Sequence, residues 1–459
     1  VFVGYDGQFG WKYGLASTWI GLGNAFLGSL LAWVVLGRRT RIMTHHLQAA
    51  TMPDFFGKRF DSHALRIAAS AIVFIFLIPY TASLYNGLSR LFGMAFDIPY
   101  SVCVILMATL TGIYVILGGY MATAINDFIQ GIIMIFGIIA VIGAVLAGQG
   151  GFINAVKSLS QLSSDVPATL GQPGAFTSFF GPDPLNLLGV ILLTSLGTWG
   201  LPQMVHKFYT IKSEKAVQTG TVISTVFAVI ISGGCYFLGG FGRLFDGAGI
   251  YTAEGAVAYD AIIPAMLSTL PDVLIGIVVI LVLSASMSTL SSLVLTSSST
   301  LTLDFIKGNI AKNLSEKKQL LLMRILIVFF IAVSVILALD PPTFIAQLMG
   351  ISWGALAGAF LAPFLYGLFW KGTTKLAVWA SFITGVGITV ANMFFKFIAS
   401  PINAGAVAMV AGLIVVPVVS LLTPKLNKQK VDQIFTCYDE KVSVKQKIAL
   451  PDDQQAERK

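Results

Sequence analysis

The sequence has 459 residues, of which 56% are hydrophobic and only 11% are charged. About a quarter of the residues in a soluble domain are charged, so the composition excludes an ordinary soluble protein and indicates many membrane spans. The net charge is +8, which in a membrane protein usually reports cytoplasmic loops rather than nucleic-acid binding. Cys103, Cys235 and Cys437 show no CxxC or Cys/His spacing, so neither a disulfide framework nor a metal site is predicted.

The chain opens with VFVGYDGQFGWKYG, and this polar, glycine-rich stretch predicts an exterior loop over residues 1–14. No signal-peptide pattern is visible in it. Because the sequence starts at Val1 rather than at a methionine, we expect that it is truncated at the N-terminus.

Long apolar stretches are the main structural signal, since a helix needs about 20 apolar residues to cross a membrane. Eleven stretches meet this requirement and predict an all-α polytopic membrane protein with about 11 transmembrane helices in residues 15–423. They are residues 15–36, 64–92, 99–118, 123–148, 186–209, 216–241, 270–303, 321–340, 344–370, 376–396 and 403–423.

Lysine and arginine are distributed unevenly between the loops that alternate along this chain. One set of loops holds most of them: Arg38, Arg39, Arg41, Lys58, Arg59, Lys207, Lys212, Lys215, Lys307, Lys312, Lys317, Lys318, Lys371, Lys375, Lys425, Lys428 and Lys430. Basic loops remain in the cytoplasm, so we expect this side to be cytoplasmic and residues 1–14 to lie outside. Residues 424–459 then form a polar cytoplasmic tail without a domain of its own, in a multi-pass protein of the plasma (inner) membrane.

Glycine and proline interrupt two of the predicted spans. In SLGTWGLPQMVHKF (195–208), two glycines and a proline cluster with an aromatic residue and an amide. In residues 348–370, glycines recur at every fourth position. Transporters use broken helices to present bare carbonyls at the membrane midplane, but small residues also allow ordinary helix packing. We expect a break in the first stretch and a packing ladder in the second.

A run of hydroxyl residues, SASMSTLSSLVLTSSST (284–300), lies deep inside an apolar span. Positions three and four apart share one helix face. The residues on or beside one such face are Ala285, Ser288, Thr289, Ser291 and Ser292. A hard cation such as sodium takes several oxygen ligands, which hydroxyls and a loosened backbone carbonyl can supply. The alternative is that the hydroxyls bond back to their own helix or pack against a neighbouring one.

Asp127 favours the cation interpretation. It lies in GGYMATAINDFIQG, early in the span predicted at 123–148. A carboxylate inside the membrane indicates function by default, although an aspartate at a helix start is also stabilised by the helix dipole. If Asp127 meets the serines of 284–300, the two together form a site with one negative charge and several neutral oxygens.

Several motifs in order make the chain similar to a known family. They are TMPDFFGKRF (51–60), ILGGYMATAINDFIQG (116–131), GTWGLPQMVHKF (197–208), LSASMSTLSS (283–292) and GALAGAFLAPFLYGLFW (354–370). With these motifs the chain resembles the sodium:solute symporter family over essentially its whole length, in particular the sodium/pantothenate and sodium/proline symporters. The resemblance implies a leucine-transporter-type fold of two inverted five-helix repeats, with two further C-terminal helices.

The resemblance also assigns sodium ligands. The family's main sodium site matches the carbonyl of Ala285 and the hydroxyls of Ser288 and Thr289. A second sodium, held in some members by an aspartate and serines, matches Asp127, Ser288, Ser291 and Ser292. Sodium is the only metal ion implied.

For the solute, the resemblance implies a pocket bordered by Tyr80, Trp199, Gly200, Gln203 and Trp353. One departure stands beside it: the family's leading helix and first core helix would precede Val1, so the implied fold lacks its first core helix. Since that helix supplies sodium ligands in the family, we expect that the chain as written does not transport.

The function implied is sodium-coupled secondary active symport that imports a small organic solute, carboxylate-bearing and of the pantothenate, proline or monocarboxylate class. One alternative is a proton-coupled carrier on the same fold, in which Asp127 or Lys207 replaces sodium. Another is a non-transporting solute sensor. No Ser-His-Asp arrangement, P-loop or nucleotide fingerprint is visible, so we expect neither an enzyme nor a cofactor other than the coupling ion. The expected partners are the solute, Na⁺ and the lipid bilayer, with no nucleic acid.

Overall fold

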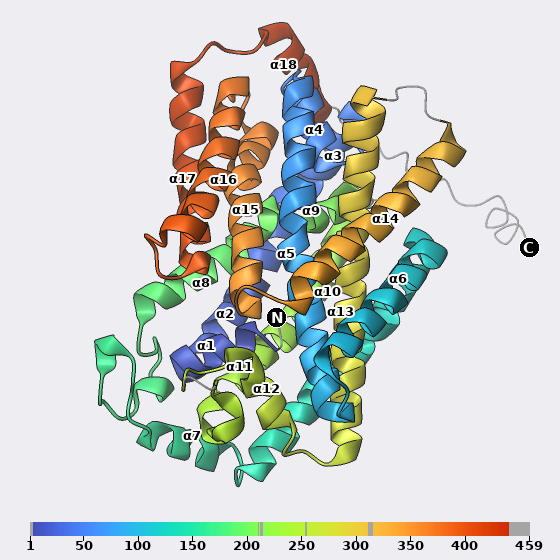
Figure 1. The fold of residues 1–459 in the computed structure, drawn as a ribbon. Coiled ribbons are helices and arrows are strands. Elements are labelled where there is room, and N and C mark those ends of the chain that lie inside the picture. Colours follow the sequence, from blue (N-terminus) through green and yellow to red (C-terminus); the bar gives the residue numbers. More distant parts are fainter. Residues whose placement is uncertain (1–2, 210, 212–213, 253–254, 311–314, 440–459) are drawn as a thin grey trace, which may run out of the picture.

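The computed structural model describes residues 3–439, except 210, 212–213, 253–254 and 311–314. Within its helices the side chains of residues 117–127, 214, 248, 309 and 310 are not described. Helices make up nearly all of the regular structure in this part of the chain (Figure 1).

The α-helices are α1 (Tyr5–Tyr13), α2 (Thr18–Gly23), α3 (Arg38–Leu47), α4 (Met52–Arg59), α5 (His63–Phe96), α6 (Tyr100–Gly148), α7 (Phe152–Gln161), α8 (Pro184–Ser195), α9 (Pro202–Tyr209), α10 (Glu214–Ala228), α11 (Gly234–Gly239), α12 (Tyr259–Leu267), α13 (Asp272–Thr300), α14 (Glu316–Leu339), α15 (Ile345–Phe369), α16 (Lys375–Phe395), α17 (Pro401–Leu422) and α18 (Lys428–Phe435). Four π-helical segments continue or join them: η2 (Asn24–Leu31), η3 (Trp33–Gly37), η7 (Val229–Gly233) and η10 (Leu301–Ile310). The 3₁₀ segments are η1 (Gly14–Ser17), η4 (Pro167–Thr169), η5 (Ala175–Thr177), η6 (Leu196–Gly200), η8 (Gly242–Phe245), η9 (Ala248–Ile250) and η11 (Thr436–Tyr438).

Every one of the eleven predicted spans lies in a helical segment. Among the described residues, nine helices are long and apolar enough to cross a membrane, and a bent pair makes a tenth span. The eleventh, Tyr100–Ile116, is an apolar helix shorter than the others. The prediction of two separate helices at 99–118 and 123–148 is wrong in one respect. The backbone between them stays helical, so both belong to α6, because the sequence there contains glycines but no proline.

The N-terminal stretch differs from its prediction as a loop. Residues Tyr5–Tyr13 form α1, in which every residue except Lys12 is buried. Gly7 and Gly10 let the backbone of α1 touch its neighbours, because a Cβ at Gly10 would lie 1.9 Å from the carbonyl oxygen of Gly239. The glycines that suggested an exposed loop instead allow close helix packing.

The helices α15, α16 and α17 pack against one another as a C-terminal block (Figure 1). The apolar window of α15 is 94% buried. The glycine ladder of 348–370 packs α15 against α16 and α17: a Cβ at Gly354 would meet the Cα of Gly405 at 2.7 Å, and a Cβ at Gly358 would meet the Cα of Gly385 at 3.0 Å. The packing interpretation of this stretch is therefore confirmed, and α15 is unbroken.

The other glycine-rich stretch does break its span. The helix α8 tightens into η6, Leu201 adopts an extended conformation, and α9 restarts at Pro202. The two parts are bent by 45°. Proline cannot donate a backbone hydrogen bond, so it begins the new helix where it interrupts the old one.

Part of the polar tail predicted at 424–459 is also folded. The short helix α18 packs against α3 and buries Val431 and Phe435. Lys430 Nζ lies 2.9 Å from Asp61 Oδ2. The tail therefore begins with a docked helix, because two apolar side chains stand among its charges.

Candidate functional site

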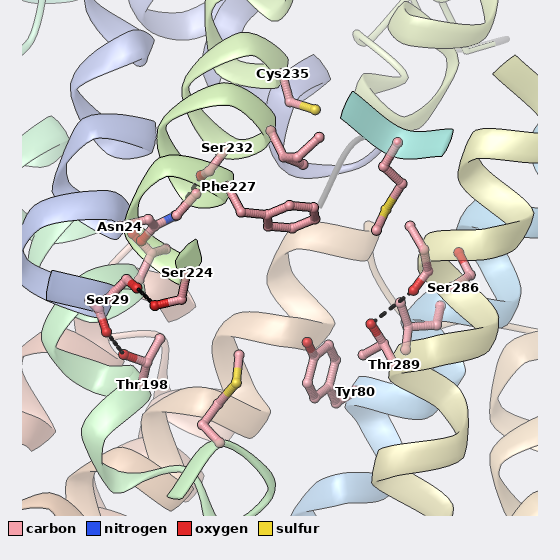
Figure 2. Close-up of a pocket in the computed structure, with 18 of the residues that line it drawn as sticks. Asn24, Ser29, Tyr80, Thr198, Ser224, Phe227, Ser232, Cys235, Ser286 and Thr289 are labelled. Carbon is pink, nitrogen blue, oxygen red and sulfur yellow. Dashed lines mark hydrogen bonds between the residues drawn. The ribbon is translucent and has the colours of Figure 1, made fainter. Parts of the chain in front are cut away.

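A cavity of about 490 Å³ lies in the middle of the helical bundle. Residues of α13 and α5 line one side of it, and residues of η2, η6, α9 and α10 line the other (Figure 2). Of the residues predicted to bind sodium, Ala285 and Thr289 line this cavity and Ser288 does not. Thr289 and Tyr80 lie on the same side of the cavity in Figure 2.

The hydroxyl groups of α13 are hydrogen-bonded within their own helix. Thr289 Oγ1 donates to the carbonyl oxygen of Ala285 at 3.0 Å, and Ser291 Oγ donates to that of Ser288 at 2.9 Å. Ser292 Oγ donates to the carbonyl oxygen of Thr289 at 2.8 Å. The back-bonding alternative thus describes this conformation, and the carbonyl of Ala285 is not loosened. A hydroxyl that donates its proton keeps lone pairs for a cation, so Thr289 still presents an oxygen to the cavity.

The second predicted sodium site is only partly described. The side chain of Asp127 lies outside the described residues, and the remaining three serines are not among those that line the cavity: Ser288, Ser291 and Ser292. Ser291 is buried, and the other two are half-buried.

Three of the five predicted solute-pocket residues line the cavity. Tyr80 and Trp353 meet edge to face, with ring centroids 5.8 Å apart. Trp199 Nε1 donates to the carbonyl oxygen of Leu27 at 3.0 Å, which ties η6 to η2. These aromatic side chains give the cavity rigid apolar surfaces.

Gly200 and Gln203 lie behind the wall rather than in it. A Cβ at Gly200 would lie 2.8 Å from the backbone nitrogen of Leu361, so the glycine permits close packing of η6 on α15. Gln203 is buried, and neither polar atom of its amide has a hydrogen-bond partner among the described residues.

The structure also places polar residues in the cavity wall that the sequence argument missed. Ser29 and Ser224 share a hydrogen bond of 2.9 Å, and Asn24 Nδ2 donates to Ser232 Oγ at 3.2 Å. All four line the cavity (Figure 2). The sequence offered one signal, the asparagine inside an apolar span, whereas serines are common where membrane helices pack.

Lys207 is the charged side chain among the residues that line the cavity. By sequence it belonged to a cytoplasmic loop, because basic residues follow it. The bend of 45° before α9 instead directs this helix along the cavity. The site therefore combines uncharged oxygens on α13 with a cation on α9.

A buried ionic network holds the end of α13 that continues into η10. Arg66 Nη2 lies 2.8 Å from Asp304 Oδ1, and its Nε lies 3.5 Å from Asp54 Oδ1. Thr51 Oγ1 donates to Asp304 Oδ2 at 2.5 Å and caps α4 by accepting from the backbone of Asp54. The motif TMPDFFGKRF thus fixes α4 against α5 and η10.

Comparisons with known proteins show which family this chain resembles. The family model described as "Sodium:solute symporter family" matches residues 1–385. A sodium/pantothenate symporter of Haemophilus influenzae is 29% identical over 394 residues, which cover 84% of this chain and 77% of that protein. A sodium/proline symporter of Staphylococcus aureus is 29% identical over 427 residues, which cover 91% and 80%.

Solved structures agree on the fold. A Na⁺-coupled sialic acid symporter in a substrate-bound outward-open state aligns with a TM-score of 0.71 at 16% identity, covering 93% of this chain and 87% of that one. A nucleobase-cation-symport-1 family transporter aligns with a TM-score of 0.54 at 10% identity, covering 95% and 92%. The inverted-repeat, leucine-transporter-type fold expected from the sequence is confirmed. The chain is a multi-pass membrane protein that belongs to the sodium:solute symporter family.

Proposed function

We propose that the protein imports a small carboxylate-bearing solute together with sodium. The observation that carries this proposal is the composition of the cavity, where Thr289 and Ala285 face a space that Lys207 also lines. An alkali cation fits the uncharged oxygens, and a carboxylate fits the ammonium group. Pantothenate and proline, named for the two relatives, both carry a carboxylate.

For sodium, we retain the carbonyl of Ala285 and the hydroxyls of Ser288 and Thr289 as ligands. Binding requires a local change, because Thr289 now donates to Ala285 and Ser288 does not reach the cavity. A loosened turn of α13 would free the carbonyl and rotate Ser288 inward. Asp127 with Ser288, Ser291 and Ser292 is the proposed second sodium site.

For the solute, the proposed pocket is formed by Tyr80, Trp199 and Trp353 with Lys207 at its polar end. The aromatic side chains cover the apolar part of the solute, and Lys207 pairs with its carboxylate. Gly200 and Gln203 shape this wall from behind.

The energy for import comes from the sodium gradient and the membrane potential. Each charge that moves inward contributes about 2.3 kcal/mol per 100 mV. With the basic ends of the helices in the cytoplasm, the C-terminus is cytoplasmic and the protein resides in the plasma (inner) membrane.

Uptake by proteoliposomes tests the proposal. Vesicles that contain the full-length protein are given radiolabelled proline or pantothenate with an inward gradient of Na⁺, of K⁺, or of H⁺ at constant Na⁺. Symport with sodium predicts accumulation above equilibrium only with the Na⁺ gradient. Accumulation driven by acid pH and indifferent to Na⁺ would instead support the proton-coupled carrier. Saturable solute binding without accumulation under any gradient would support the sensor.

A competition panel then tests the solute class. Unlabelled proline, pantothenate, lactate and their amides or methyl esters are added in excess. The proposal expects that the free acids compete and that the matching uncharged amides and esters do not. Equal competition by acid and amide would contradict a role for the carboxylate.

A further inference from the structure

The helix α1 carries a buried aspartate, Asp6, that has no role in the proposed sodium symport. Asp6 is 0% exposed, and neither of its carboxyl oxygens has a hydrogen-bond partner among the described residues. Within the same part of the chain no ion pair joins it to a lysine, arginine or histidine. A carboxylate in this state is costly, because burial removes its charge from water and no partner compensates for the loss.

The acid is held against α11 by backbone contact. A Cβ at Gly239 would lie 2.4 Å from the carbonyl oxygen of Asp6 and 3.0 Å from its Cβ, so nothing larger than glycine fits there. The thiol of Cys235, a weak donor, lies beside the carboxyl group. Cys235 also lines the central cavity, and so does Gly4, two residues before Asp6. Cys235 therefore lies both beside the carboxyl group and in the cavity wall.

Among the described residues no lysine, arginine or histidine around α1 pairs with Asp6, although the positive charge of the chain's amino terminus acts on it. The titratable and charged groups on the elements packed against α1 are Cys235 and Tyr236 of α11, Tyr259 and Asp260 of α12, Arg243 of η8 and Tyr366 of α15, while η1 has none. Cys235 and Tyr236 are the ones that interact with Asp6. The others have partners elsewhere: Arg243 bonds Asp165 and the carbonyl of Trp11, Asp260 accepts from the backbone of Ile345, Tyr366 donates to Leu413, and Tyr259 contacts Lys12.

We propose that Asp6 is a proton-binding site, occupied in this conformation, whose proton exchanges with the central cavity when α1 and α11 separate. A proton fits better than sodium, because sodium needs several oxygen ligands and the neighbours of Asp6 include a thiol and aromatic rings. A proton needs no coordination shell and removes the charge that burial penalises. When the contact at Gly239 opens, water from the cavity reaches the carboxyl group and can accept the proton. Solute uptake then depends on pH as well as on sodium.

Infrared spectroscopy of the purified protein tests whether the proton is present, and it requires no transport. At neutral pH the wild-type spectrum should contain the C=O band of a protonated carboxyl group. The difference spectrum between wild type and Asp6→Asn should show that the variant lacks this band. Asp97→Asn is the matched control, since Asp97 is exposed and its removal should leave the band unchanged. Identical bands in wild type and Asp6→Asn would overturn the proposal. If Asp6→Asn does not fold, Cys235→Ala should shift the same band, and an unshifted band would also overturn the proposal.

The pH profile of uptake tests the exchange. With a constant sodium gradient and labelled proline or pantothenate, wild type and Asp97→Asn should show the same dependence on pH. Asp6→Asn should lose that dependence and keep its dependence on sodium. A profile unchanged by Asp6→Asn would mean that the proton is fixed, which contradicts exchange. If no solute is carried at all, sodium symport fails, but the infrared result still decides the protonation of Asp6.

Discussion

The two walls of the cavity are built in opposite ways. The wall on α13 belongs to a regular helix of 29 residues, whose hydroxyls bond back to their own backbone. The opposite wall is made of interrupted helices, with π-helical turns in η2 and η7 and a break between η6 and α9. Its polar groups bond between helices, as Ser29 does to Ser224.

This difference separates two tasks. The hydroxyl groups of the regular wall have hydrogen-bond partners when no ligand is bound. An empty cation site there would therefore cost little free energy. The irregular wall is stabilised by single hydrogen bonds across helices, which must rearrange when a solute enters. Segments with π-helical turns are frequent at functional sites, and here they border the cavity together with Lys207.

The largest effect is expected where the regular wall is anchored. Arg66→Gln leaves the buried Asp304 without its cation, and such a loss costs about 3–5 kcal/mol of unfolding free energy. Asp54 keeps its ion pair with Lys58, whose Nζ lies 2.9 Å from Asp54 Oδ2. Unfolding of the purified protein by denaturant measures the loss. Arg66→Lys keeps the charge and should recover part of the loss. A change below about 1 kcal/mol for Arg66→Gln would show that the network does not anchor α13.

The proposed cation site on the same wall is tested by Thr289→Val, which keeps the shape of the side chain and removes its oxygen. A hydrogen bond or ligand contact to a charged group is worth about 1.5–3 kcal/mol, so the sodium affinity should fall by about 10- to 100-fold. Ser298→Ala is the control, since Ser298 bonds to Val294 on the same helix and does not line the cavity. Sodium activation of uptake is measured, and equal activation in both variants would contradict the site.

On the opposite wall, Lys207→Gln should raise the KM for a carboxylate solute by about tenfold, or about 1.4 kcal/mol, with the sodium affinity unchanged. The reason is the loss of one charge-assisted hydrogen bond. Lys207→Arg should retain most of the affinity. If the KM stays the same while sodium activation changes, Lys207 acts on the ion rather than on the solute.

A smaller effect should distinguish hydrogen bonds between helices from those within one helix. Ser224→Ala removes the bond to Ser29 and should cost about 0.5–1.5 kcal/mol of stability. A double-mutant cycle with Ser29→Ala isolates the coupling between the two residues. Ser291→Ala, which removes a bond to its own helix, should cost less. A larger loss of stability for Ser291→Ala than for Ser224→Ala would contradict the difference between the two walls.

The smallest effect concerns the exposed pair of Asp61 and Lys430 outside the membrane spans. The hydrogen bond from Lys430 lowers the pKa of Asp61, so the folded state favours the ionised form. Its contribution is present at neutral pH and is lost as the pH falls through that lowered pKa, below about 3.9. Because the pair is exposed, Asp61→Asn should change stability by at most about 1 kcal/mol at neutral pH. The difference in Tm between wild type and Asp61→Asn should vanish in acid. A difference that grows in acid would contradict a lowered pKa for Asp61.

The sequence was sufficient for the fold and for part of the cavity. Apolar length located the helical segments of the predicted spans, although two of these spans belong to the single helix α6. The GTWGLPQ motif located the break, because proline and glycine act locally on the backbone. Tyr80, Trp199 and Trp353, which the resemblance assigned to the solute pocket, line the cavity, and their contact with a solute stays a prediction. The sodium ligands and the orientation of the protein in the membrane stay predictions.

What the amino-acid sequence alone determined was the class of the protein, since hydrophobicity, helix period and chain breaks depend on neighbouring residues. The tertiary structure decided which polar side chains meet. It buried the glycine-rich start as α1, brought Lys207 into the cavity and paired Arg66 with an aspartate 238 positions away. These outcomes depend on helix packing, in which glycines permit contact and a bend of 45° redirects a helix, and such contacts between distant residues leave no local pattern in the sequence.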